Sequence, residues 1–405
     1  MLREKTAVRT GRARPVLFLL LASPVIAELL WGTTTVSQAP GLLFQIGLYG
    51  CGAIVIREAV VRWGAGWPSV LLLGLAYGAI EEGLLEPTWL TPRLFPHPYG
   101  FAGGVYWTYA VFNAGYHAVF SIGIPVALTE ILFPAWRGRP WLHRPGLSVA
   151  GAVYLVNAAA IGVAWYTVLQ KSAFGIPARV HPVQMAGVAV LVVALIAAAR
   201  LAASRRATGQ LTPEPLAAGQ RTAEVSRAPD SGPAASARAV PGRPALPGPR
   251  SLGFIAAAAA LLWFAILLVA TSQDALSGLP FEVPLIIIGA AVAWAVRWVV
   301  HRPPPSARRL MAACAGALVV QAAAGFVSTG LHDPVNIAGK AVLNVAELVV
   351  LAVLYRRLPA DGPRDSPATG AACGSAGAES PTSPELADSA AGGPGGAASP
   401  QADAS

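Results

Sequence analysis

Two adjacent glutamates, Glu81 and Glu82, lie inside an apolar stretch that begins near Trp67. Ionisable side chains are expensive in a nonpolar medium, so these carboxylates are expected to face a partner or a water-filled cavity. Both cannot ionise cheaply at such close range, so one of them is expected to hold a proton. The pair therefore predicts a site that handles protons, water or a cation.

A histidine and an asparagine in the next long apolar run are expected to complete this site. Four polar residues recur there at intervals of four and so share one helical face: Tyr109, Asn113, His117 and Ser121. With a helical rise of about 1.5 Å per residue, Glu82 lies about 6 Å outside the membrane midplane. Glu28, in the first apolar run, falls at a similar depth. We therefore expect Glu28, Glu81 or Glu82, Asn113 and His117 to meet in one pocket.

Three kinds of chemistry suit these residue types, and one alternative involves none. Glu81 or Glu82 could act as a base on water, with His117 as its partner and Asn113 as an oxyanion donor. Glu82 and His117 could instead bind a divalent metal that keeps one position open. The carboxylates could also relay protons in a transporter, with a pathway through Glu28, Tyr109, Ser121 and Glu347. In a scaffold without catalysis, the same groups would only hydrogen-bond helices to one another.

The elements that must position these residues are membrane-spanning helices. The chain has 405 residues, of which 55% are hydrophobic and 12% charged; soluble proteins carry about 25% charged residues. The net charge of +9 does not predict nucleic-acid binding, because the arginines lie beside the ends of apolar runs and in polar tails. The lipid bilayer and an unknown substrate or solute are the expected partners. The three cysteines form no disulfide pattern and no paired metal-ligand spacing.

The apolar runs and their basic flanks predict an all-α, polytopic bundle of about ten spans, six plus four, with both termini cytoplasmic. Pro125 is expected to kink the fourth span. The expected spans are 15–36, 42–61, 67–88, 105–133, 147–169, 183–203, 252–272, 283–300, 310–331 and 339–356.

This pattern divides the chain into five expected regions. Residues 1–14 form a basic cytoplasmic leader, and 15–203 form a six-span membrane module that carries the Glu/His residues. Residues 204–250, which are rich in Pro, Ala and Arg, predict a disordered cytoplasmic linker. Residues 251–357 form a four-span module, and 358–405 a disordered cytoplasmic tail.

Three further patterns carry structural expectations. Gly74 and Gly78 lie on the same helical face as Glu82 and Glu86, so a neighbouring helix is expected to approach them closely. A buried or snorkelling ion pair is expected near the inner boundary, from Arg57, Glu58 and Glu130. A second polar stripe, expected to hold a structural Lys–Glu pair, comprises Lys340, Asn344 and Glu347.

The pair Glu81–Glu82 followed by His117 on the next span resembles the CPBP family of CAAX-protease-like and bacteriocin-processing membrane proteins. The resemblance implies a membrane hydrolase in which the Glu–His group activates water for peptide cleavage. The sequence departs from the family's EExxxR and FxxxH motifs at Glu86 and Asn113. The stretches IREAVVRWGAGWPS, AYGAIEEGL and YHAVFSIGIP are also similar to a group of uncharacterised bacterial multi-pass proteins. We therefore expect a bacterial cytoplasmic membrane protein.

Overall fold

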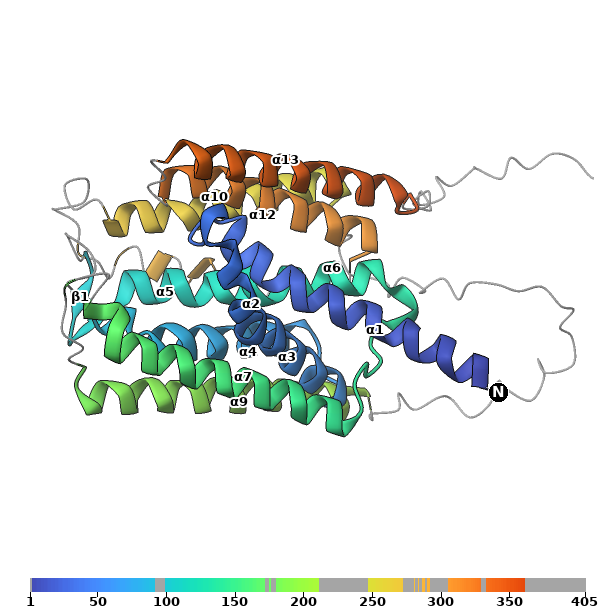
Figure 1. Ribbon diagram of the computed structural model, residues 1–405, viewed down its shortest axis with the longest axis horizontal. Coiled ribbons are helices and arrows are strands. Elements are labelled where there is room, and N and C mark those ends of the chain that lie inside the picture. The colour runs from blue at the N-terminus through green and yellow to red at the C-terminus, as the bar shows by residue number, and fades with distance from the viewer. Residues whose placement is uncertain are drawn as a thin grey trace, which may run out of the picture. The chain divides into compact units, whose positions relative to one another are not determined.

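Helices make up nearly all of the chain described by the computed structural model (Figure 1). The described residues are 2–91, 99–171, 175, 180–210, 247–271, 280, 283, 286–287, 290–291, 305–328 and 333–360. The α-helices are α1 Leu2–Pro24, α2 Leu42–Gln45, α3 Cys51–Arg62, α4 Trp67–Ala79, α5 Trp107–Tyr116, α6 Ile124–Leu132, α7 Arg144–Ala164, α9 Pro182–Gln210, α10 Pro249–Thr271, α12 Ala307–Ser328 and α13 Pro334–Arg357.

Several of these helices continue into shorter helical segments of a different type. The π-helical segments are η1 Val25–Leu29, η3 Ile46–Gly50, η4 Ile80–Leu85, η7 His117–Gly123 and η9 Trp165–Leu169. The 3₁₀ segments are η2 Val36–Gly41, η5 Thr88–Leu90 and η8 Pro134–Trp136.

Eight helical segments of the described chain are long and apolar enough to cross a membrane, which confirms the all-α polytopic bundle. They are Val36–Arg62, Trp67–Leu85, Trp107–Leu132, Arg144–Val168, Pro182–Ser204, Pro249–Ile266, Ala307–Val327 and Pro334–Arg357. The expected first span is not among the eight; it is built from α1 and η1 and loses helix after Leu29. Most of the expected span 283–300 lies outside the described residues, so the total of ten and the cytoplasmic termini stay predictions.

The expected regions differ from the observed helices at their edges. The basic leader is not separate from the first span, because α1 begins at Leu2. Helix α9 continues to Gln210, seven residues into the expected linker, and α10 begins at Pro249. The remainder of the linker, 211–246, and the tail from 361 lie outside the described residues.

Two glycines let α4 and the fourth span approach closely, as the small-residue stripe predicts. A Cβ added to Gly74 would lie 2.7 Å from the Cα of Ala118, and one added to Gly78 would lie 3.1 Å from the Cβ of His117. Residues with larger side chains would push the helices apart. The two glycines therefore bring the helix that carries Glu81 against the helix that carries His117.

Pro125 changes the hydrogen bonding of the fourth span. Proline has no backbone N–H, so it cannot bond to the carbonyl of the residue four positions earlier, which is Ser121. That carbonyl instead accepts a hydrogen bond of 2.6 Å from the hydroxyl of Ser23 in α1. The span is π-helical immediately before Pro125, at η7, and α1 is attached to it there.

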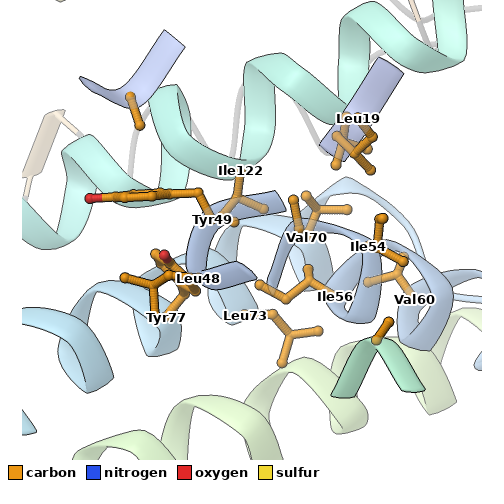
Figure 2. Close-up of a cluster of buried hydrophobic side chains, with 14 of the residues drawn as sticks. Leu19, Leu48, Tyr49, Ile54, Ile56, Val60, Val70, Leu73, Tyr77 and Ile122 are labelled. Atoms are coloured by element: carbon orange, nitrogen blue, oxygen red, sulfur yellow. The ribbon is translucent and has the colours of Figure 1, made fainter. Parts of the chain in front are cut away.

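A cluster of buried apolar side chains lies beside these helices (Figure 2). Leu48, Ile54 and Val60, from the second span, face Val70 and Leu73 of α4. Two tyrosines, Tyr49 and Tyr77, lie at the end of this cluster away from Val60 (Figure 2). The apolar core therefore ends in two hydroxyl-bearing side chains.

The three helices of the C-terminal part, α10, α12 and α13, lie together, and α12 also packs against α6 (Figure 1). Helices α10 and α12 meet at Gly253 and Gly316, where an added Cβ on Gly253 would lie 3.1 Å from the carbonyl oxygen of Ala312. The short loop before α5 holds a two-residue hairpin, β1 Phe101–Ala102 with β2 Val105–Tyr106. Its turn is Gly103–Gly104, and both residues have the positive φ that such a turn requires.

The expected ion pair near the inner boundary forms a buried cluster around Arg57. The guanidinium contacts Glu58 at 2.8 Å and Glu130 at 2.7 Å, and it lies 3.5 Å from the ring centroid of Trp141. Its remaining donors bond the backbone oxygens of Trp136 and Arg139. All five N–H groups of Arg57 are therefore used, and its carboxylate partners also accept bonds from backbone N–H groups of the loop after α6.

Candidate functional site

The ionisable residues expected in the outer half of the membrane all lie on π-helical segments. Glu28 lies on η1, Glu81 and Glu82 on η4, and His117 on η7. Each segment lies next to or contains a helix-weakening residue: Pro24 before η1, Gly83 in η4, and Gly123 with Pro125 at the end of η7. Single π turns inside α-helices occur frequently at functional sites, because the extra residue redirects side chains.

The imidazole of His117 lies between the two adjacent glutamates, and we call these three residues the Glu/His site. Its Nδ1 is 3.4 Å from Oε2 of Glu81, and its Nε2 is 3.6 Å from Oε1 of Glu82. Both distances exceed the range of about 2.7–3.2 Å for an N–H···O hydrogen bond. His117 is 2% exposed and Glu81 5% exposed. The structure thus brings together the three ionisable residues that the sequence pattern singles out.

The hydrogen bonds of the Glu/His site are incomplete. Nδ1 of His117 lies 3.1 Å from the hydroxyl of Ser121, one turn further along the same helix. Oε2 of Glu81 is buried and accepts no hydrogen bond from any described residue, whereas Glu82 is bonded by the hydroxyl of Thr88 at the outer end of the span. Ser121 therefore holds the imidazole in place. Each carboxylate would need to move only a short distance to form a hydrogen bond with the imidazole.

The arrangement does not suit a metal centre. The two carboxylates approach opposite nitrogens of one ring, so they cannot bind a single ion together with that ring. Among the described residues, no group of three His, Cys, Asp or Glu side chains is arranged to hold a metal ion. A three-residue metal centre built on Glu82 and His117 therefore does not fit the residues present.

Glu28 reaches the Glu/His site through Tyr49 and not by direct contact. The Tyr49 hydroxyl donates a 2.6 Å bond to Oε1 of Glu28, and its ring stacks on His117 with centroids 6.1 Å apart. The other oxygen of Glu28 accepts bonds from the hydroxyls of Thr33 and Thr34, at 2.7 and 2.9 Å. This carboxylate is therefore held by three hydroxyl donors where the first span loses its helical form.

The remaining expected residues lie near the site or apart from it. Asn113 is buried and donates to the hydroxyl of Tyr109, on its own helix, at 3.5 Å, while its side-chain oxygen has no hydrogen-bond partner among the described residues. Glu347 lies on α13, in the C-terminal group of helices. Within the described residues, the expected Lys–Glu pair forms no ion pair; Nζ of Lys340 bonds the carbonyls of Leu30 and Trp31 instead.

Several residues of the site are not predictable as such from the sequence. Tyr49, Tyr77 and Tyr116 surround His117, with ring centroids between 5.7 and 6.1 Å away. Aromatic residues are common in membrane helices, mostly near the interfaces. The signal that could have identified these three tyrosines is their position well inside apolar runs, where a hydroxyl must find a partner.

Glu86, just beyond the span that carries the Glu/His site, occupies the position of the arginine in the EExxxR motif. Burial raises the pKa of this carboxyl well above its usual range, and the nearby carboxylates of Glu82 and Glu81 raise it further. An arginine would be favoured in that position by the same charges. The local environment is therefore acidic where the CPBP motif has a cation.

The chain belongs to an uncharacterized membrane protein family, whose sequence model matches residues 16–360. No curated protein and no solved structure matches the chain. The matched region includes the Glu/His site and both groups of helices. Family membership and the apolar helices together establish a multi-pass membrane protein, and the family description carries no activity.

Proposed function

We propose that this protein is a proton-coupled membrane transporter of small solutes, in which Glu81, His117 and Glu82 transfer the proton. The observation that carries the proposal is the position of the His117 imidazole between two carboxylates, with one carboxylate at each ring nitrogen. A neutral imidazole accepts a proton at one nitrogen and can release one from the other. A ring flanked in this way can therefore pass a proton between the carboxylates without leaving its place.

The spacing of the groups supports transfer that can be switched. At 3.4 and 3.6 Å the ring nitrogens lie just beyond hydrogen-bond distance of the carboxylates. A movement of less than about 1 Å would make or break either link. Because Gly74 and Gly78 hold the two helices in close contact, such a movement would accompany any small shift of α4 against the fourth span.

The end of the first helix also supports transport, because it places a carboxylate beside the Glu/His site. Here α1 continues into the π-helical η1 at Val25, the helix ends at Leu29, and Glu28 lies in its last turn. Tyr49 connects this carboxylate with His117, so Glu28 and the Glu/His site form one polar region. Chains of ionisable residues inside membrane bundles commonly serve as proton relays.

Hydrolysis of the CPBP type is the second candidate, because Glu82 and His117 face each other on neighbouring helices, as that resemblance implies. It is the weaker proposal for two reasons. Glu81 lies at the opposite side of the ring from Glu82, so the paired carboxylates do not converge on one water. Glu86 and Asn113 occupy the positions of two motif residues.

Infrared titration of the protein in lipid tests the proton-transfer proposal. The wild type is expected to show a protonated-carboxyl band that titrates with pH, is lost in Glu81→Gln or Glu82→Gln, and shifts in His117→Ala. Asp333→Asn is the matched control, since Asp333 is an exposed carboxylate that caps α13 outside the bundle interior. If the spectra of wild type, Glu81→Gln and Glu82→Gln titrate identically, the site moves no proton and the proposal is wrong.

Two further assays separate the candidate functions. In proteoliposomes, an imposed proton gradient should drive uptake of at least one solute from a panel of small solutes, and Glu81→Gln should abolish that uptake. Purified protein incubated with membrane peptides should leave them intact. Cleavage that depends on both Glu82 and His117, without solute uptake, would favour the hydrolase.

A further inference from the structure

A second group of buried polar side chains lies between α12, α13 and the first span. Gln321 is fully buried and Asn344 is 7% exposed. The side-chain oxygens of both, and both carboxylate oxygens of Glu347, accept no hydrogen bond from the described part of the chain. Buried acceptors in native proteins are almost always paired with protein groups or ordered water. Four such oxygens on two neighbouring helices therefore require a hydrogen-bond donor other than these protein groups.

The helix register places these acceptors close together. The side-chain nitrogen of Asn344 donates to the carbonyl of Ala322 at 3.2 Å, so Asn344 lies level with Gln321. Glu347 follows Asn344 by three residues, on the same helical face and about 4.5 Å further along the axis. Lys340 interacts electrostatically with Glu347. The ammonium of Lys340, however, donates its hydrogen bonds to two backbone carbonyls.

This second group packs against the π-helical segment η1, which carries Glu28 at the end of the first helix. The side-chain nitrogen of Gln321 donates to the carbonyl of Ile26 and to the hydroxyl of Tyr116, both at 2.8 Å. Tyr116 in turn donates to the carbonyl of Ala27 at 2.6 Å. The two carbonyls belong to the two residues immediately before Glu28, so α12 and the fourth span contact the backbone of this segment next to Glu28.

We propose that Gln321, Asn344 and Glu347 line a water-filled site that connects the Glu28 segment with the inner face of the membrane. Water fits this set of groups, because each molecule donates two hydrogen bonds to oxygen acceptors. The titratable groups around the site are Glu28 on η1, Tyr116 on α5 and Lys340 on α13. The use of this water for proton supply rests on the proton-transfer function proposed above.

The expected topology directs this site inward. Helix α13 is expected to run from the outer to the inner face, and Glu347 lies on the inner side of Asn344. About 12 Å beyond Glu347, Tyr355 on the same helix lines a shallow surface pocket together with Arg308 and Arg250. The outer part of the α12–α13 pair is closed by Lys340 and the first span, so the inner side is the route by which water would reach Glu347.

Cysteine labelling in membrane vesicles, in which a thiosulfonate forms a mixed disulfide with the thiolate and releases a sulfinate, tests the site. The three native cysteines are first replaced by serine. Asn344→Cys and Glu347→Cys are then each compared with Val345→Cys. Val345 lies on the same helix and is 60% exposed on the side that faces away from the bundle. A membrane-impermeant thiosulfonate should modify Asn344→Cys about tenfold faster than Val345→Cys, because only the thiolate reacts and thiols ionise in water. The difference should occur only when the reagent is applied to the inner face.

The outcomes distinguish this proposal from the one on which it rests. Equal, slow labelling of all three variants would overturn the water-filled site, whatever the infrared titration of Glu81 shows. Protection by sodium but not by a bulky organic cation would overturn water in favour of a metal-cation site. Fast labelling without a titrating Glu81 would support the water-filled site and contradict proton transfer.

A second measurement keeps the test valid if the cysteine variants fail to fold. The infrared difference between wild type and Glu347→Gln isolates the Glu347 carboxyl at acid pH, with all native cysteines in place. Transfer into heavy water should shift this band within the mixing time. A band that stays unshifted for hours would mean that Glu347 is dry and that the proposal is wrong.

Discussion

Two regions of the bundle each place one nitrogen-bearing side chain between two carboxylates. Near the expected inner face, Arg57 lies between Glu58 and Glu130; in the outer half, His117 lies between Glu81 and Glu82. In both regions two of the residues are adjacent in sequence and the third partner comes from another helix. The two regions differ in how completely their hydrogen bonds are made.

The Arg57 cluster is saturated and the Glu/His site is not. Every N–H of Arg57 has an acceptor at 3.2 Å or less, and Glu58 accepts from Arg57, Arg62 and a backbone N–H. At the Glu/His site both carboxylate contacts are longer than hydrogen bonds, and Oε2 of Glu81 has no donor in the part of the chain that the structure describes. A saturated buried ion cluster fixes a structure. A buried cluster whose hydrogen bonds are incomplete can still exchange protons. The Arg57 cluster is therefore suited to a structural role and the Glu/His site to proton transfer.

Arg57→Met should break the saturated cluster and produce the largest effect. Glu58 is fully buried, and removing Arg57 leaves it only the longer contact with Arg62 and one backbone N–H, while Glu130 loses its cation. The expected loss in the free energy of unfolding is about 3–5 kcal/mol. Thermal unfolding in lipid nanodiscs measures this, with Arg62→Met as the control, because Arg62 is partly exposed and its pairing is worth less than about 1 kcal/mol. Equal stability of the two variants would contradict a structural role for the Arg57 cluster.

The Glu/His site could be predicted from the sequence because its residues are ionisable, whereas the residues around them in the chain are apolar. Two carboxylates and a histidine in apolar runs, with glycines on the same face as Glu82, indicate which helices must meet. The partners that complete the site, Tyr49, Tyr116 and Thr88, carry a weaker signal, because they are uncharged and only the depth of the tyrosines within apolar runs distinguishes them.

The π segments and the early end of the first helix were also unpredictable from periodicity. One extra residue in a helical turn changes the direction of Glu28 and Glu82 without altering the apolar pattern over the span. Depth along the helices predicts one pocket for Glu28 and the Glu/His site, but it does not predict that Tyr49 lies between Glu28 and His117. The pairing of Lys340 with carbonyls of Leu30 and Trp31 depends on a tertiary contact across more than 300 residues, as the Lys340–Leu30 separation of 310 shows.

Glu81→Gln should sharpen the comparison by giving the opposite result to Arg57→Met. The carboxylate is buried and lacks a full set of donors, so its replacement by a neutral group of the same shape removes a desolvation cost. The free energy of unfolding is expected to change by less than about 1 kcal/mol or to increase, as at sites kept for function at the expense of stability. The same nanodisc measurement checks it. A loss as large as that of Arg57→Met would mean that Glu81 holds helices together as Glu58 does.

Glu86→Gln should have the smallest effect, visible only as a change in pH dependence. Burial and the neighbouring carboxylates raise the pKa of Glu86 above its usual value of about 4.3, so the folded protein holds this proton more tightly than the unfolded chain does. Stability contributed by that proton is fully present below the unfolded-state pKa and is lost as pH rises towards the folded-state pKa. Glutamine cannot lose a proton, so the variant should show a shallower fall in thermal stability as pH increases above about 4.3. Asp333→Asn, which changes an exposed carboxylate at a helix N-terminus, should leave that slope as it is in the wild type. If Glu86→Gln also leaves the slope unchanged, the acidic region around Glu82 does not extend past the end of its span, and the unfilled hydrogen bonds are confined to the Glu/His site.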